Sequence, residues 1–311
     1  MNDINVKQNK EEILLYFFTQ RKLYSKAKKI NLLLFWIGVA IYILGLLPIV
    51  KSKFDYYYNV ATVAWIVISQ ILNDRSVSTK LMAAEYQEYI DRSLFEFPIN
   101  NDIISNLDKL RRCAIDLKIK HNKEFNEKVK PNAKETVYNW YSDVSNLPIE
   151  IARIFCQNEN CHWENKLRRD YNKILYFLII TAVSTYVYLL VKYYSGHAIF
   201  NLIYAVPISI EIIKLIKHNN AIVKICDELE DRMNRVYTYI SEKLEDMDNQ
   251  YLYNESIAIQ RKIFEYRKTN IPIPNFLYNF LRKRYQKESN QFIKMLKDEI
   301  LEKYKSIVIE D

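Results

Sequence analysis

NLLLFWIGVAIYILGLLPIV, residues 31–50, contains no charged side chain. As an α-helix this stretch is about 30 Å long, which matches the hydrocarbon thickness of a bilayer. Three more uncharged windows follow at residues 56–73, 174–191 and 193–210. A helix in the core of a soluble protein is usually shorter and keeps a polar stripe. The four windows therefore predict four membrane-spanning helices.

The windows fall into two pairs, and each pair has a short connector. KSKFD (residues 51–55) separates the first two windows, and little more than Lys192 separates the last two. Runs of tyrosine at 56–58 and 193–194 stand beside these turns, as expected for rings at a membrane surface. The predicted fold class is an all-α membrane protein with two transmembrane helical hairpins and long cytoplasmic helices.

Basic residues gather before the first and third windows and after the fourth, whereas the short connectors hold only Lys51, Lys53 and Lys192. The positive-inside rule therefore places both termini and the long middle segment in the cytoplasm. The predicted organisation is a cytoplasmic N-terminal amphipathic helix (1–30), transmembrane hairpin 1 (31–73), a cytoplasmic helical region (74–173), transmembrane hairpin 2 (174–217), and a cytoplasmic helical stalk with C-terminal helices (218–311).

Prolines predict the helix boundaries outside the membrane. One helix is expected to continue from the second span to about Ser93, another to run from about residue 101 to 129, and a third to begin near Pro148. No glycine or proline occurs between Pro207 and Pro272. The fourth span is therefore expected to continue as a long helix.

Apolar residues recur along this long helix with an eleven-residue repeat. Such a repeat gives about 3.67 residues per turn and predicts a nearly straight or slightly right-handed supercoil. Two interpretations stay open: a self-associating stalk that joins subunits, and a helix packed against its own chain. The stripe consists of Ile225, Leu229, Met233, Val236, Ile240, Leu244, Met247 and Tyr251.

The composition excludes several classes of protein. The 311 residues include only 3 glycines, which argues against a Gly-rich phosphate loop, a Rossmann turn or a many-turned β fold. The 4 cysteines lack the spacing of a disulfide framework, as suits a reducing compartment. The formal charge is +8, yet no pattern typical of DNA or RNA binding accompanies it. No acid–base pair or metal set lies within the spans, so we expect neither an enzyme nor a cofactor.

CQNENCHWENKLRRDY, residues 156–171, gathers two cysteines, a histidine and two glutamates within nine positions. A structural zinc site usually needs a C-x-x-C pair and a second pair downstream, and no second pair follows here. On a helix, Cys156 and Cys161 point about 140° apart. An apolar stripe that includes Trp163, Leu167 and Tyr171 is the more coherent feature. We therefore expect no metal or catalytic site, but a helix that leads into the third span.

Four stretches stand in a fixed order around the spans. They are TQRKLYSKAKK (19–29), DRSVSTKLMAAEYQEYIDRSLFEFP (74–98), ARIFCQNENCHWENKLRRDY (152–171) and QRKIFEYRKTNIPIPNFLYNFLRKRY (260–285). In these stretches, and over nearly its whole length, the chain resembles the SMODS-associating four-transmembrane effectors, which are pore-formers of bacterial antiphage defence. None of the stretches is a catalytic motif.

The resemblance implies a partner and a mechanism. Such effectors are encoded beside a nucleotidyltransferase that makes a cyclic oligonucleotide. This messenger opens a pore, which disrupts the bacterial inner membrane and stops growth (abortive infection). The expected partners are the lipid bilayer, the messenger and further copies of the chain, since one four-span subunit has few inward polar groups. The alternative is a non-conducting four-span membrane receptor or scaffold, or a small transporter.

A pore needs polar side chains along its wall. Serine and threonine in spans also form hydrogen bonds between helices. Glu211 has two interpretations as well, a cation-selecting ring or an interfacial pair with Lys214. The pore-lining candidates are Asn59, Thr62, Ser69, Gln70, Thr181, Ser184, Thr185 and Glu211.

An anionic messenger needs cations at its site. Basic clusters beside a bilayer commonly contact solvent or anionic lipid, but arginine also pairs bidentately with phosphate. Two basic clusters could meet between neighbouring subunits to bridge such a ligand. The ligand-binding candidates are Arg111, Arg112, Arg282 and Arg284.

Overall fold

The structure is a computed structural model that describes residues 2–46, 53–99, 104, 106–133, 135–192 and 196–310. In these residues every regular element is an α-helix, which confirms that the fold is all-α. The helices are α1 (Ile4–Lys7), α2 (Glu11–Leu46), α4 (Asp55–Phe95), α5 (Leu107–Lys120), α6 (Asn122–Lys128), α7 (Ile149–Lys192), α8 (Gly196–Glu242), α9 (Asn249–Thr269) and α10 (Asn275–Glu310).

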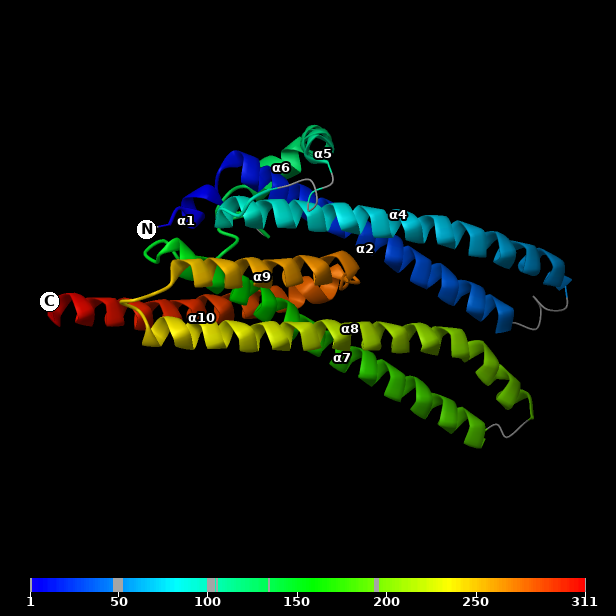
Figure 1. Ribbon diagram of the computed structural model, residues 1–311. Coiled ribbons are helices and arrows are strands. Elements are labelled where there is room, and N and C mark those ends of the chain that lie inside the picture. The colour runs from blue at the N-terminus through cyan, green and yellow to red at the C-terminus, as the bar shows by residue number, and fades with distance from the viewer. Residues whose placement is uncertain are drawn as a thin grey trace.

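Two long hairpins project in the same general direction from a bundle of helices (Figure 1). The first is α2 packed on α4, and the second is α7 packed on α8. We call the described residues of 31–73 and 174–217 the arms, and all other described residues the base. Both ends of the chain lie at the base, away from the hairpin tips (Figure 1). Residues 47–52 and 193–195, which include the ends of two predicted spans, lie outside the described residues.

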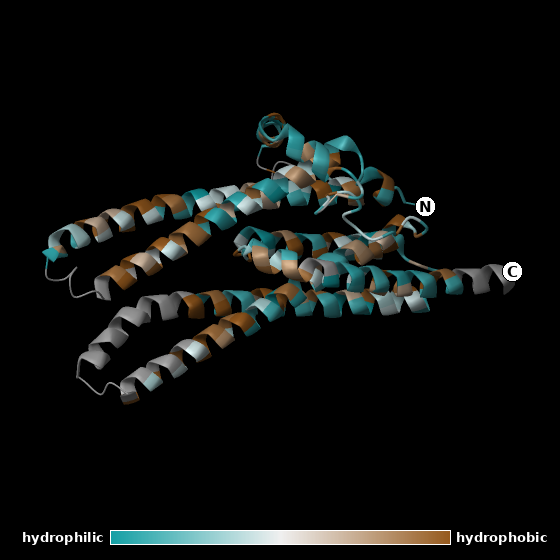
Figure 2. Cartoon of the chain, turned by 180° about the vertical axis from the view of Figure 1, so that it is seen from behind, coloured by the Kyte–Doolittle hydropathy of each residue, from teal (hydrophilic) through white to brown (hydrophobic). Residues whose placement is uncertain are grey.

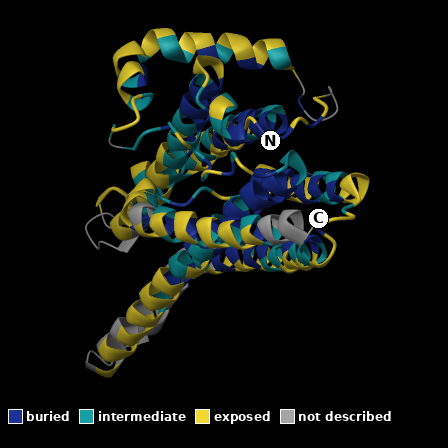
Figure 3. Cartoon of the chain, turned by 90° about the vertical axis from the view of Figure 1, so that its left-hand side faces the viewer, coloured by how far each residue is buried: buried dark blue, intermediate teal, exposed yellow. Residues whose placement is uncertain are grey.

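The arms differ from the base in hydropathy and in burial. Hydrophobic residues dominate the parts of the arms that Figure 2 colours, whereas hydrophilic residues are frequent in the base. Exposed residues are frequent in the described parts of the arms, and buried residues concentrate in the base (Figure 3). Within the described ranges, no helix has both the length and the apolar character needed to cross a membrane.

Two predicted helix boundaries are close to the observed ones. α4 continues out of the first arm and ends at Phe95, two residues beyond the predicted Ser93. Glu96 follows in the left-handed conformation (φ 56°), which ends a helix. α7 begins directly after Pro148, because proline fits the start of a helix, where a missing N–H removes no helical hydrogen bond.

Two other boundaries differ from the prediction. The helix expected from residue 101 to 129 is divided into α5 and α6 at His121, whose φ of −125° is not helical. The long helix that leaves the second arm ends at Glu242, and Asp248 starts α9. The Asp248 carboxylate accepts hydrogen bonds from the backbone N–H of Gln250 and Tyr251, so that it caps α9. A side-chain cap therefore starts a new helix without any glycine or proline.

The eleven-residue stripe of α8 packs against its own chain. Leu229, Met233, Val236 and Ile240 are buried in the hydrophobic core of the base. Tyr251, at the end of the stripe, is exposed on α9. Of the two interpretations, the structure supports packing within the chain and gives no free stripe for a stalk between subunits.

A buried ion pair joins the first hairpin to α9. Arg267 of α9 donates from Nη1 to the Asp91 Oδ2 atom of α4 at 2.6 Å. The Tyr141 hydroxyl donates to the other carboxylate oxygen of Asp91. Both members of the ion pair are almost fully buried, so each depends on the other for compensation of its charge.

The same network reaches the second hairpin through amide side chains. Gln260 of α9 donates from Nε2 to Glu88 (2.7 Å) and to Asp91 (3.1 Å) on α4. Its Oε1 atom accepts a hydrogen bond of 3.1 Å from Gln157 of α7. α9 therefore connects buried polar groups of both hairpins, and Arg153 of α7 also donates directly to the Phe95 carbonyl of α4 at 2.6 Å.

Candidate ligand-binding cavity

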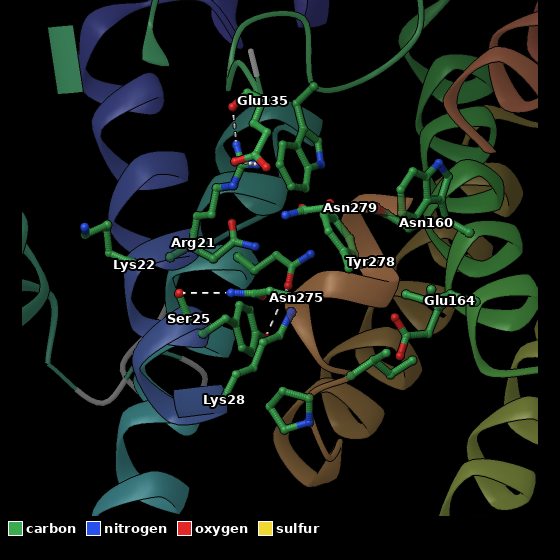
Figure 4. A pocket seen from close by; sticks show the side chains of 18 of the residues that line it. Arg21, Lys22, Ser25, Lys28, Glu135, Asn160, Glu164, Asn275, Tyr278 and Asn279 are labelled. Atoms are coloured by element: carbon green, nitrogen blue, oxygen red, sulfur yellow. Dashed lines mark hydrogen bonds and ion pairs between the residues drawn. The ribbon is translucent and has the colours of Figure 1, made fainter. Parts of the chain in front are cut away.

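A cavity of about 530 Å³ lies at the root of the two hairpins. α2 forms one wall, α7 forms the opposite wall, and the start of α10 lies between them (Figure 4). Further lining comes from residues 135–141, which precede α7, and from parts of α6 and α9. We call this space the inter-hairpin cavity. Its volume is within the range of about 300–1,000 Å³ that is common for small-molecule sites.

Cations predominate over carboxylates in the lining of the inter-hairpin cavity. Burial raises the pKa of Glu159, although hydrogen bonds from Ser142 and Ser289 act in the opposite direction. The cations are Arg21, Lys22, Lys28, Lys29, Lys128, Arg168 and Arg267, and the carboxylates are Glu124, Glu135, Glu159 and Glu164.

Helical spacing brings the α2 side chains to the cavity. Arg21, Ser25 and Lys28 are separated by four and three residues, which places them on one face of a helix. Figure 4 shows the three side chains along the same wall. Arg21 pairs with Glu135 (Nη2–Oε2 3.3 Å), and Lys22 pairs with Glu124 (Nζ–Oε2 2.8 Å). These pairs tie α2 to the segments that precede α7.

Lys28 is a partly buried cation of this wall that contacts an aromatic ring. Its Nζ atom lies 5.1 Å from the centroid of the Tyr278 ring, a cation–π distance. In the part of the chain that the structure describes, no carboxylate lies within ion-pair distance of this amine. Burial lowers the pKa of Lys28 to about 8, although the charge of Glu164 acts in the opposite direction. A half-buried amine without an anion is poised to accept one.

Aromatic rings form much of the remaining surface. Trp140 is held by stacking on Phe17 at 4.8 Å between ring centroids. Trp163 of α7 contacts Tyr278 (5.4 Å) and Tyr285 (5.6 Å) of α10. These ring contacts hold Trp140, Trp163 and Tyr278 in place in the cavity lining.

Hydrogen bonds secure the α7 wall to the segment between α9 and α10. Glu164 accepts from Arg168 Nε at 2.7 Å and from Asn270 Nδ2 at 2.9 Å. Arg168 is fully buried and also donates to the Ile271 carbonyl at 3.2 Å. Across the cavity, Asn275 of α10 donates to Ser25 Oγ of α2 at 3.1 Å. The α7 wall is thus held to α10 and the segment before it by several contacts. The Asn275–Ser25 hydrogen bond and the contact of Lys28 with Tyr278 join α10 to α2.

The ligand-binding candidates from the sequence lie elsewhere. Arg111 and Arg112 are exposed on α5, and Arg111 pairs with Asp108 at 3.6 Å. Arg284 is exposed on α10, and the side chain of Arg282 lies outside the described residues. Arg111, Arg112 and Arg284 are not in the cavity lining. Binding of a ligand between subunits at these residues stays a prediction.

The pore-lining candidates of the second span bond within their own helix. Asn59 donates to Asp55, Thr62 to the Tyr58 carbonyl, Ser69 to the Ile66 carbonyl, and Gln70 to Asp74. On α7, Thr181 and Ser184 are exposed, and the Thr185 side chain lies outside the described residues, as does that of Glu211. Their role in a pore stays a prediction.

The cysteines of the 156–171 stretch belong to the core. Cys156 and Cys161 are buried on α7, and Cys226 is buried on α8. Among the described residues, no group of three histidine, cysteine or acidic side chains is arranged to hold a metal ion. Leu167, Trp163 and Tyr171 instead pack with α10, as the predicted apolar stripe requires.

Native-state alkylation is expected to separate these thiols from Cys113, which is partly exposed. Burial raises the pKa of Cys156, Cys161 and Cys226, which removes the reactive thiolate. Iodoacetamide followed by mass spectrometry should label Cys113 at least about tenfold faster than the other three. In guanidinium chloride all four should react alike. Rapid native labelling of Cys156 or Cys161 would contradict their placement in the core.

A signal for the cavity was present in the sequence. Most of the cavity lining comes from three of the stretches that carry the family resemblance. They are residues 19–29, 152–171 and 260–285. Taken alone, the first stretch indicates the membrane orientation, the second a helix that leads into the third span, and the third a basic cluster. Only the tertiary structure shows that the three stretches meet around one cavity.

The fold and the cavity define an all-α protein with two protruding hairpins and a cation-rich, aromatic cavity at their root. Residues 2–296 match the family model of the SMODS-associating 4TM effector domain, and the chain belongs to this family. It is therefore a SMODS-associated effector of antiphage defence based on cyclic oligonucleotides. No match is found among curated proteins or among solved structures.

Proposed function

We propose that the chain is a non-enzymatic, pore-forming effector that crosses the bacterial inner membrane four times and is opened by a cyclic oligonucleotide. The family supplies the effector class and the kind of signal. The observation that carries the membrane part of the proposal is the exposure of apolar side chains on both arms.

Large apolar side chains of the arms are exposed in both hairpins. Val63 and Ile66 of α4 are each 62% exposed, and Phe177 and Ile180 of α7 are 69% and 64% exposed. Consecutive residues such as Ile66, Val67 and Ile68 are all exposed, so the apolar surface extends around the helix. Contiguous apolar surface of this kind marks a membrane or protein contact. Lipid on the outside and neighbouring copies on the inside would cover it.

The proposed orientation follows the basic residues. The base, with both chain ends and the inter-hairpin cavity, lies in the cytoplasm, and the hairpin tips reach the far side of the membrane. A messenger made in the cytoplasm then meets the base. For gating, the messenger must bind the open state more tightly than the closed state, because equal affinity shifts no equilibrium.

Several copies are needed to enclose a conducting path. One pair of hairpins leaves few polar side chains for a lumen, and the candidates at Asn59, Thr62, Ser69 and Gln70 use their polar atoms within α4. In a ring of copies, the same polar side chains of every copy would surround one central axis and together line the lumen. A non-conducting receptor or a transporter needs no such ring.

Dye release from proteoliposomes tests this function. Full-length protein is reconstituted into vesicles loaded with a self-quenched dye, and cyclic di-AMP, cyclic GMP-AMP and cyclic tri-AMP are added separately. We expect rapid release with at least one of them and none with the linear dinucleotide pApA. Release without any nucleotide would contradict gating. Absence of release with all three, from protein verified to be inserted, would favour the non-conducting receptor.

A further inference from the structure

We propose that the inter-hairpin cavity is the binding site of the cyclic oligonucleotide, with phosphates on the α2 wall and bases against aromatic rings. This inference rests on the proposed function, to which it adds a location and a mode of control. The site differs from the exposed Arg111 and Arg112 of α5 and from the exposed Arg284 of α10.

The α2 wall has the chemistry that a phosphodiester requires. Phosphate groups retain their charge at neutral pH, and charge-assisted hydrogen bonds from lysine and arginine are the strong contacts available to them. Lys28 faces the cavity without a carboxylate partner among the described residues, and Arg21 stands on the same face of α2. An entering phosphate would therefore gain a partner without first breaking an ion pair of Lys28.

The aromatic groups suit the bases of the same ligand. Bases of any sequence stack on aromatic side chains, which is how proteins commonly hold unpaired nucleotides. Tyr278 and Trp163 present rings from α10 and α7, and Trp140 presents one from the segment before α7. The amides of Asn160, Asn275 and Asn279 lie around the same space (Figure 4). Amides both donate and accept, as recognition of base edges requires.

The position of the cavity gives binding a mechanical consequence. α2 packs mainly on α4, whereas α7 packs mainly on α8, so the two cavity walls belong to different hairpins. The bond from Asn275 to Ser25 (3.1 Å) and the contact of Lys28 with Tyr278 reach across the space. A ligand that contacts Lys28 and Trp163 together would set the separation of the hairpins where they leave the base. The ligand would thereby favour one arrangement of the arms.

The test compares two lysines on α2. Lys28→Met removes the cavity amine but keeps a chain of similar length, and Lys26→Met removes an exposed lysine two residues away that does not line the cavity. Tyr278→Leu removes the ring beside Lys28. Binding of cyclic di-AMP, cyclic GMP-AMP and cyclic tri-AMP to the full chain in detergent is measured by isothermal titration calorimetry. Thermal unfolding confirms that each variant is folded.

For the nucleotide that binds most tightly, we expect Lys28→Met to weaken binding at least about tenfold, as for loss of a charged hydrogen bond. Tyr278→Leu should weaken binding as well, and Lys26→Met should leave it unchanged.

If the wild type binds and releases dye while Lys28→Met and Tyr278→Leu bind equally well, the cavity is not the site, and the proposed function stands. If the wild type binds none of the three nucleotides and releases no dye, both the site and the function are wrong. If Tyr278→Leu does not fold, Lys28→Met decides.

Discussion

Arg267→Ala is expected to lower the free energy of unfolding by about 3–5 kcal/mol, because it leaves the buried Asp91 carboxylate without its cation. Burial is the largest single influence on the pKa of Arg267 and lowers it, but Asp91 together with Tyr266 and Tyr141 holds the pKa of the guanidinium well above its usual value. Tyr141 and Gln260 also depend on Asp91 for hydrogen bonds. The measurement is urea unfolding of the full chain in mild detergent, followed by tryptophan fluorescence.

Arg261→Ala is the matched control for this prediction. Arg261 lies on the same helix, α9, but is exposed. Its replacement should change the free energy of unfolding by no more than about 0.5 kcal/mol, as is usual for surface positions. Equal effects of the two substitutions would show that the Asp91–Arg267 pair does not hold α9 to the first hairpin.

The second large effect is expected from charges in the arms. The double substitution Ile66→Arg and Ile180→Arg places a guanidinium on each hairpin at exposed apolar positions. On the scale for membrane insertion, an arginine near the middle of a span costs about 2.5–3.5 kcal/mol. We expect the variant to be removed from membranes by alkaline carbonate and to lose nucleotide-triggered dye release.

Val77→Arg controls for the added charge. Val77 is exposed on α4 like Ile66, but it lies beyond the predicted span at 56–73. The control variant should stay in the carbonate-resistant membrane fraction. If the Ile66→Arg, Ile180→Arg protein is retained there as well as the control, the arms do not cross the bilayer.

Local sequence was sufficient for the long elements of the fold. The uncharged windows marked both hairpins, and Pro148 marked the start of α7 to within one residue. The apolar stripe through Trp163 and Leu167 identified the 156–171 stretch as a packed helix, as its contacts with α10 confirm. Each of these features can be recognised within a short window of sequence, from the absence of charged residues, from a proline or from a regular apolar spacing.

Local patterns could not predict features that depend on contacts between residues far apart in the sequence. Ser25 and Asn275 meet across the cavity although 250 positions separate them. Lys28 has the same local context as the other basic residues before the first span, and only its burial beside Tyr278 distinguishes it. The end of α8 at Glu242 was missed for a different reason, since the Asp248 cap of α9 uses no helix-breaking residue.

Current across a planar bilayer tests the account most directly. The full chain is inserted so that the base faces one compartment, and the tightest-binding of the three cyclic nucleotides is added to each side in turn. We expect discrete conductance steps when the nucleotide is on the side of the base, and none when it is on the side of the hairpin tips. Absence of current when the nucleotide is on the side of the base would contradict a pore that is opened from the inter-hairpin cavity.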